Sequence, residues 1–253
     1  MLNIGWFSTG RDKAARQLLQ AVQECISTGD IKGKINFVFS NREPGQSQES
    51  DLFFDLVRSY NIPLVYFSHS KFKASIESRV NWRLKYDTEV TRRIEKFSPD
   101  LCVLAGYMLI IGKELCQKYN MINLHPAAPG GPVGSWQEVI WKLIKNKAEE
   151  AGAMIHLVTP ELDRGPVVSY CLFPIKHKPF DQYWQKEDQE MLFKLIRQHE
   201  LAREFPLITS TLKALSQGKI SIQSGRIIDT QGNSIQGYNL TGEINQALKA
   251  NLT

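Results

Sequence analysis

Asn123 and His125 place an amide donor and an imidazole close together at the end of a predicted strand. The two residues are separated only by Leu124, so on an extended segment their side chains point to the same side. Three prolines and two glycines occupy the seven residues from Pro126 to Pro132, and this composition forbids a helix. The pair is interpreted either as two groups aimed at a ligand or as a hydrogen-bonded turn that caps backbone groups.

A second polar segment, Thr159-Pro-Glu-Leu-Asp163-Arg-Gly-Pro166, forms a turn between two predicted strands. The carboxylate of Asp163 could orient a histidine or stabilise its charge, as carboxylates commonly do. The alternative is an ordinary Asp-Arg-Gly turn. His156, on the strand before this turn, is interpreted as a structural histidine near the site.

The first part of the chain alternates short apolar runs with amphipathic segments, which predicts βαβ units and an α/β fold with a mostly parallel sheet. The near-continuous apolar run at 101–105 suits a sheet with helices on both faces. In such sheets ligands bind beyond the carboxyl ends of the strands. The predicted strands are 3–7, 35–39, 64–67, 101–105 and 121–124, and the predicted helices are 14–26, 52–60 and 83–97.

After His125 the pattern changes toward an antiparallel extension. Ser135 and Glu138 form a predicted capping box at the start of a helix over 135–144. Further predictions are strands at 152–158 and 167–175, a polar loop at 176–188, a helix over 189–215 disturbed at Pro206, a hairpin of 219–222 with 226–228, and a terminal helix from Thr241.

Composition indicates a soluble globular protein of the cytoplasm. The 253 residues are 42% hydrophobic and 23% charged, and the four cysteines form no C-x-x-C pair, so they are expected to be reduced thiols. The N-terminus has no signal-peptide pattern, and the longest apolar stretch, 101–111, is too short to span a bilayer.

The formal charge is +5, with lysines and arginines dispersed along the chain. Such an excess indicates either a solvated surface or a local field that attracts anionic ligands. The sequence contains no basic stripe interleaved with aromatic residues, so neither a nucleic-acid partner nor a membrane partner is expected.

Several stretches together resemble the folate-dependent formyltransferase superfamily, and within it the phosphoribosylglycinamide formyltransferases. The resemblance covers about residues 3–238 and rests most specifically on Asn-x-His-Pro followed some 35 residues later by Leu-Asp-x-Gly-Pro. It implies a Rossmann-like sheet with a C-terminal antiparallel extension and hairpin. The similar stretches include Val38-Phe-Ser-Asn41, Leu104-Ala-Gly-Tyr-Met108, Asn123-Leu-His-Pro126 and Thr159-Pro-Glu-Leu-Asp-Arg-Gly-Pro-Val167.

The resemblance implies one domain over 1–253, with a nucleotide and phosphate side in 1–120 and a catalytic and folate side in 121–253. It also implies formyl transfer from 10-formyltetrahydrofolate to an amine. Asn123 would stabilise the oxyanion, His125 as imidazolium would supply charge and proton transfer, and Asp163 would hold His125 and help to deprotonate the amine. The chemistry needs no metal, and no His/Cys cluster with ligand spacing suggests one.

The loops that follow the fourth strand and precede Asp163 would line the folate pocket in this family. The family often carries arginine where this chain has Leu109. Plain core residues are the alternative interpretation. The implied folate-binding residues are Met108, Leu109, Ile110, Ile111, Val158, Thr159 and Leu162.

The acceptor side departs from the family pattern. A Ser-Gly-x-Gly-Ser-Asn phosphate loop is replaced here by Ser8-Thr-Gly-Arg-Asp-Lys13, so the backbone cradle is poorer and a charged side chain would have to compensate. An acceptor without phosphate at this loop is the alternative. The expected acceptor-binding residues are Gly10, Arg11, Asp12, Lys13, Arg83 and Glu200, with Arg203 and Glu204 competing with Glu200.

Three functions are therefore open. The first is a formyltransferase acting on glycinamide ribonucleotide or another small, possibly phosphorylated amine. The second is a 10-formyltetrahydrofolate hydrolase, whose relatives usually carry an extra N-terminal domain. The third is a non-catalytic folate-binding protein. A methionyl-tRNA formyltransferase is disfavoured, because that family adds a C-terminal β-barrel. The protein is expected to be a monomer or a homodimer.

Overall fold

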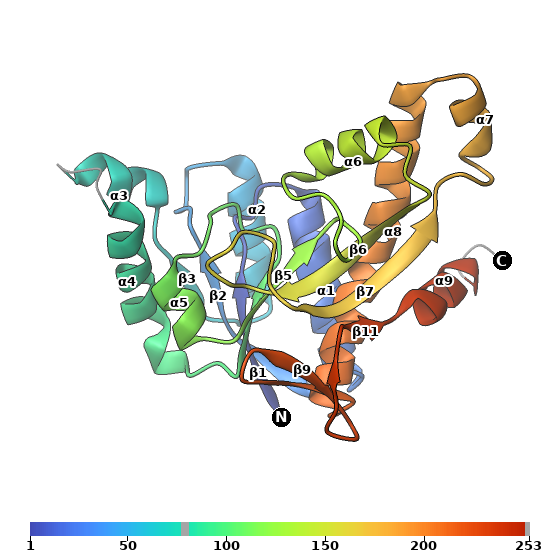
Figure 1. The fold of residues 1–253 in the computed structure, drawn as a ribbon. Coiled ribbons are helices and arrows are strands. Elements are labelled where there is room, and N and C mark those ends of the chain that lie inside the picture. The colour runs from blue at the N-terminus through green and yellow to red at the C-terminus, as the bar shows by residue number, and fades with distance from the viewer. Residues whose placement is uncertain (77–80, 251–253) are drawn as a thin grey trace. The chain divides into compact units, whose positions relative to one another are not determined.

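The computed structural model describes residues 1–76 and 81–250, and the chain divides into two compact units (Figure 1). The first unit contains Met1–Asn123 and Val158–Leu162, and the second contains Leu124–Leu157 and Asp163–Thr253. These compact units do not test the predicted single domain with functional halves 1–120 and 121–253, which stays a prediction. Eight strands form one mostly parallel sheet, which confirms the predicted fold class.

The first unit contributes parallel strands in the order β3-β2-β1-β4-β5. Pairing Phe7 of β1 with Phe39 of β2 and Leu104 of β4 places the ends of three strands in register. Each of these strands lies where the apolar runs predict it. The strands are β1 (Leu2–Phe7), β2 (Gly33–Ser40), β3 (Leu64–Tyr66), β4 (Leu101–Leu104) and β5 (Met121–His125).

Helices cover both faces of these strands (Figure 1). On one face, α4 (Trp82–Ile94) and α5 (Lys113–Lys118) bury Tyr86, Val90 and Leu115 against phenylalanines of β1 and β2. On the other lie α1 (Lys13–Ser27) and α2 (Gln48–Ser59), with α1 burying Leu18, Leu19 and Val22. Two short elements complete the unit: α3 (His69–Ser75) and the 3₁₀ helix η1 (Glu95–Phe97).

The second unit is built on an antiparallel strand pair, β6 (Glu150–Leu157) and β7 (Val167–Pro174), with the short β11 (Tyr238–Asn239) parallel to β7. Helix α6 (Trp136–Lys145) begins at the predicted capping box of Ser135 and Glu138. Its buried Ile140 and Ile144 pack with Ile196 of α8 (Gln189–Ser216). The terminal helix α9 (Thr241–Ala250) begins where predicted.

A separate small antiparallel sheet contains the predicted hairpin. Its order is β10-β9-β8, with β8 (Ile220–Gln223), β9 (Arg226–Asp229) and β10 (Ser234–Ile235). Ser224 and Gly225, both at positive φ, make the turn between β8 and β9. The predicted antiparallel extension and hairpin are thus both present.

Two local predictions were wrong, and two short helices were missed. The polar loop at 176–188 contains the short helix α7 (Asp181–Gln185), and the short helices α3 and α5 were not predicted. Helix α8 continues through Pro206 without a break. An internal proline costs about 3 kcal/mol because it removes one helical hydrogen bond and crowds the preceding turn. The neighbouring Leu207 and Ile208 are fully buried, and this packing holds the helix together.

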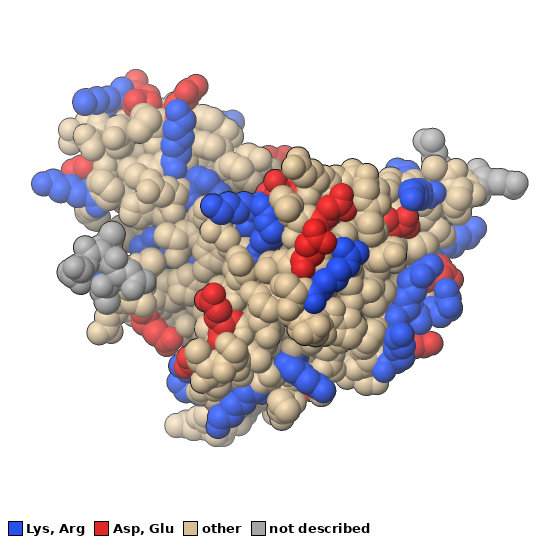
Figure 2. Space-filling model, turned by 180° about the vertical axis from the view of Figure 1, so that it is seen from behind, with Lys and Arg blue, Asp and Glu red and all other residues tan. Residues whose placement is uncertain are grey.

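Cys102, Cys116 and Cys171 are free thiols, and Cys102 and Cys171 are buried. The described part of the chain contains no helix that is both long and apolar enough to cross a membrane. On the face shown in Figure 2, acidic side chains lie between the lysines and arginines on a largely uncharged surface. The small positive excess is therefore spread out on this face.

Candidate active site

The carboxylate of Asp163 lies between two imidazole rings of the second unit. Its Oδ2 is 3.8 Å from Nδ1 of His125, and its Oδ1 is 3.6 Å from Nε2 of His156. The three side chains are almost entirely buried, with exposed fractions of 4% for His125, 3% for His156 and 10% for Asp163. One carboxylate therefore faces two histidines out of contact with most of the solvent.

The outer nitrogen of each ring also faces an acceptor. Nε2 of His125 is 3.2 Å from the carbonyl oxygen of Pro132, and Nδ1 of His156 is 2.9 Å from the carbonyl oxygen of Leu157. A carbonyl oxygen only accepts, so each of these nitrogens carries a proton when the hydrogen bond forms. A neutral ring would then turn a lone pair toward Asp163. The two carbonyl partners therefore set which nitrogen of a neutral ring carries the proton.

Burial and charge set different protonation states within this cluster. Burial lowers the pKa of His125, Asp163 and the Pro132 carbonyl oppose that shift, and His156 adds to it, so that the pKa stays below its ordinary value. Burial raises the pKa of Asp163, but a hydrogen bond from His156 and the charges of His125 and His156 outweigh it and lower the pKa. Relative to the free side chains, the surroundings thus favour the neutral form of His125 and the ionised form of Asp163. The imidazolium at His125 stays a prediction, which the burial of the ring opposes.

Local backbone structure explains how these side chains reach one another. His125 is the last residue of β5, with Asn123 two positions earlier on the same strand, as predicted from the sequence. Asn123 is half-buried. Asp163 has a φ of 51°, in the left-handed region that aspartate tolerates better than most residues. The turn at Leu162 and Asp163 directs the carboxylate back toward the end of β6, which carries His156.

His156 was predicted to be structural, yet it contacts the same carboxylate as His125. The sequence indicated that His156 lies close to the site, because it stands near the end of the strand that leads into the Asp163 turn. Its contact with Asp163 could not be predicted, because that contact depends on the register of the turn. Among the described residues, no group of three or more His, Cys, Asp or Glu side chains is arranged to hold a metal ion.

The predicted folate-binding residues all belong to the first unit. Met108, Ile110 and Leu162 are large apolar side chains with exposed fractions of 48%, 41% and 48%. Ile111 is buried, while Leu109 and Val158 both pack against the core cluster beneath α4 and α5. Thr159 donates its hydroxyl proton to the carbonyl oxygen of Glu161 at 3.1 Å. These segments therefore combine anchored residues with exposed apolar ones, which a purely structural loop would not require.

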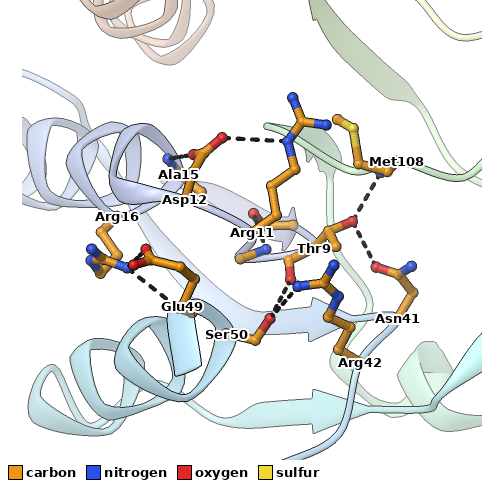
Figure 3. A network of polar contacts seen from close by, with 12 residues as sticks. Thr9, Arg11, Asp12, Ala15, Arg16, Asn41, Arg42, Glu49, Ser50 and Met108 are labelled. Carbon is orange, nitrogen blue, oxygen red and sulfur yellow. Dashed lines mark hydrogen bonds and ion pairs between the residues drawn. The ribbon is translucent and has the colours of Figure 1, made fainter. Parts of the chain in front are cut away.

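The first loop, residues 8–13 after β1, has its charged side chains engaged in contacts within the loop and with the start of α1 (Figure 3). Asp12 is the N-cap of α1, and its Oδ1 accepts from the Ala15 amide at 3.0 Å. Its other oxygen pairs with Arg11 at 3.3 Å. Gly10 has a φ of 62°, and a Cβ there would lie 2.8 Å from the ring of Phe53, so no other residue fits without displacement. A carboxylate of the chain itself therefore occupies a position that favours anions.

The remaining two acceptor-side predictions lie in different environments. Arg83 is exposed on α4, where its guanidinium lies 5.6 Å from the ring centre of Trp82. Glu200 is fully buried in α8, and neither of its carboxylate oxygens has a hydrogen-bond partner. Arg197 lies 3.8 Å away but makes its closer contact with Glu204. Burial raises the pKa of Glu200 well above its ordinary value. Because the residue is fully buried, an acceptor could reach its carboxyl only after a rearrangement.

A family model described as "Formyl transferase" matches residues 8–187. The chain therefore belongs to the formyl transferase family, and the predicted class of enzyme is confirmed. Phosphoribosylglycinamide formyltransferase of Escherichia coli is 30% identical over 159 residues, which are 62% of this chain and 68% of that relative. The crystal structure of phosphoribosylglycinamide formyltransferase from Coxiella burnetii shares the fold, with a TM-score of 0.72, 21% identity, and coverage of 94% of this chain and 98% of that one.

A second activity occurs among the similar proteins. Formyltetrahydrofolate deformylase of Haemophilus influenzae is 26% identical over 125 residues, covering 49% of this chain and 41% of the relative. The deformylase structure from Pseudomonas syringae shares the fold with a TM-score of 0.67 at 19% identity, covering 90% of this chain and 65% of that one. Proteins named as formyltransferases and proteins named as deformylases are thus both similar to this chain.

Proposed function

We propose that this protein transfers the formyl group of 10-formyltetrahydrofolate to a primary amine, with glycinamide ribonucleotide as the acceptor. The observation that carries the proposal is the contact between His125 and Asp163. His125 lies two positions beyond Asn123 on the same strand. Family membership and the similarity to the E. coli formyltransferase support the reaction and the acceptor. We place the reaction in the cytoplasm.

In this reaction the amine attacks the formyl carbon, and negative charge develops on the formyl oxygen. We assign the Asn123 amide as the donor to that oxygen. The carbon–nitrogen bond to the folate then breaks, the folate nitrogen takes up a proton, and the new formamide leaves with the formyl group. Folate supplies the activated one-carbon unit, and the protein orients the groups and moves the protons.

The protonation state of the cluster favours proton transfer as the role of His125. Because burial lowers its pKa, the imidazole starts neutral and can accept the proton that the attacking amine releases. The ionised Asp163 then stabilises the resulting imidazolium, since its charge opposes the effect of burial. His125 can pass the same proton to the departing folate nitrogen. Of the two roles expected of His125, charge stabilisation and proton transfer, the lowered pKa supports proton transfer.

The deciding experiment is an acceptor screen with 10-formyltetrahydrofolate, in which glycinamide ribonucleotide, other small amines and water are offered separately. We expect formylation of glycinamide ribonucleotide and a loss of about 100-fold or more in kcat for Asn123→Ala. Asn120→Ala, at an exposed residue just before the same strand, is the matched control. Transfer to a different amine would reject the acceptor but keep the reaction, whereas full activity of Asn123→Ala would reject the mechanism.

The second candidate is hydrolysis of 10-formyltetrahydrofolate, supported by the similarity to the deformylases. The same three residues would then activate water in place of an amine. Formate release at an equal rate with and without any amine would favour this function over formyl transfer.

A further inference from the structure

The loop that we propose for folate binding, residues 107–111, has buried residues at its two ends and exposed side chains between them. Tyr107 and Ile111 have exposed fractions of 7% and 4%. Between them, Met108 and Ile110 direct apolar side chains outward, with exposed fractions of 48% and 41%. The position of these two side chains therefore depends on how the backbone of this short loop is held.

Thr9 holds the start of this loop through its hydroxyl group (Figure 3). Its Oγ1 accepts from the Met108 amide at 3.0 Å and donates to Oδ1 of Asn41 at 2.8 Å. Asn41 also contacts Nδ1 of His69 through its amide nitrogen at 3.3 Å. Since the one hydroxyl proton points at Asn41, a lone pair is left for the Met108 amide. The direction of both hydrogen bonds is thus set.

Thr9 is itself held on its backbone. Its amide donates to the carbonyl oxygen of Gly106 at 3.1 Å, and its carbonyl oxygen accepts from the Ser50 hydroxyl at 3.2 Å. The side chains of Thr9 and Asn41 are buried, with exposed fractions of 3% and 2% for the two residues. Buried hydrogen bonds of this kind are costly to leave unmade, so the network gives the loop a defined position.

The end of the loop is held independently. Oδ2 of Asp87 accepts from the Gly112 amide at 2.6 Å. A Cβ on Gly112 would lie 2.3 Å from the same oxygen, so glycine permits this approach. The loop is therefore tied to α4 at one end and to Thr9 at the other.

We propose that Thr9 is a positioning residue for 10-formyltetrahydrofolate, which acts by fixing the backbone of Met108. This inference rests on the proposed function, because the role of the loop in folate binding is itself part of that proposal. Thr9 directly precedes Gly10–Lys13, the segment expected to bind the acceptor. Thr9 thus adjoins the proposed acceptor loop in the chain, while its hydroxyl contacts the proposed folate loop.

The test compares Thr9→Val, which keeps the shape and removes the hydroxyl, with Thr9→Ser, which keeps the hydroxyl. For Thr9→Val we expect the KM for 10-formyltetrahydrofolate to rise about tenfold with kcat within about twofold of wild type. Hydrogen exchange at the Met108 amide should accelerate about tenfold as well. Thr9→Ser should restore both values to near wild type, which a merely structural loss would not do.

Thr211→Val is the matched control, because it makes the same substitution at an equally buried threonine of α8, whose hydroxyl pairs with Ser169, and leaves the Thr9 network intact. It should leave the folate KM and the Met108 exchange rate unchanged. An unchanged folate KM in Thr9→Val, or a Thr9→Ser variant as impaired as Thr9→Val, would overturn the inference. A wild-type protein that neither binds nor uses 10-formyltetrahydrofolate would instead overturn the proposed function, and a faster Met108 exchange in Thr9→Val would then still show that Thr9 holds the loop.

Discussion

Oδ2 of Asp163 and Nδ1 of His125 lie 3.8 Å apart, with both side chains almost completely shielded from solvent. Asp163 shares its other oxygen with His156, so one carboxylate serves two imidazoles. The charge on Asp163 favours a proton on His125 and so opposes the effect of burial on the pKa of that ring. The proton transfer proposed for His125 depends on this interaction with Asp163.

Replacing Asp163 by asparagine tests this dependence. The variant keeps the size of the side chain and removes its charge, so a protonated His125 loses the group that stabilises it. We expect kcat for formyl transfer to fall by at least about 100-fold, measured with saturating substrates. Glu161→Gln, an exposed carboxylate of the same turn, should leave kcat unchanged. Equal effects of the two substitutions would show that Asp163 acts only through the net charge of the turn.

His156→Gln should raise the pKa of His125. The charge on His156 lowers that pKa in the wild-type protein, so its removal makes protonation of His125 easier. The pKa can be measured by NMR titration of labelled imidazole rings between pH 4 and pH 8. His177→Gln, at an exposed loop histidine, is the control and should not shift the titration. A lower pKa of His125 in His156→Gln would contradict the electrostatic picture of the cluster.

Asp87 predicts an unusual dependence of stability on pH. Burial raises its pKa from 3.8 to about 6, although the Gly112 amide and Arg83 oppose the shift. The folded protein then binds the proton more tightly than the unfolded chain, so this group's contribution to stability falls as pH rises from about 4 to about 6. The loss is complete above that range.

Asp87→Asn removes this penalty while keeping an oxygen for the Gly112 amide. We expect the free energy of unfolding at pH 7.5 to increase by up to roughly 2–3 kcal/mol, with the gain disappearing toward pH 4. Denaturant titrations at several pH values provide the measurement. A variant less stable than wild type at pH 7.5 would show that the Gly112 hydrogen bond needs the full charge.

Asp12 bears on the acceptor. Its carboxylate caps α1, and a phosphate at this loop would lie beside a like charge. Asp12→Asn should keep the cap, because asparagine caps helices about as well as aspartate. We expect the KM for glycinamide ribonucleotide to fall roughly fivefold, as the removal of about 1 kcal/mol of repulsion in a solvated site implies. Asp55→Asn, an exposed carboxylate of α2, should not change it. An unchanged KM in Asp12→Asn would mean that the acceptor places no phosphate at this loop.

The sequence by itself determined the elements whose causes are local. The alternation of apolar runs and amphipathic segments set β1 to β7 and the long helices, and the capping box of Ser135 and Glu138 set the start of α6. Asn123 and His125 both lie on β5. Their spacing of two residues points both side chains to the same face, because side chains of a strand alternate between its two faces. The motifs that carry these residues also identified the family.

Tertiary structure decided what depends on distant partners and on desolvation. His156 became a second partner of Asp163 through the register of the turn between them. Burial lowered the pKa of His125, because solvent access depends on segments far apart in the chain. Glu200 became fully buried and α8 continued through Pro206, since packing in the second unit outweighs local preference. The reach of the Thr9 hydroxyl to Met108, across 99 residues of sequence, was likewise decided only by the fold.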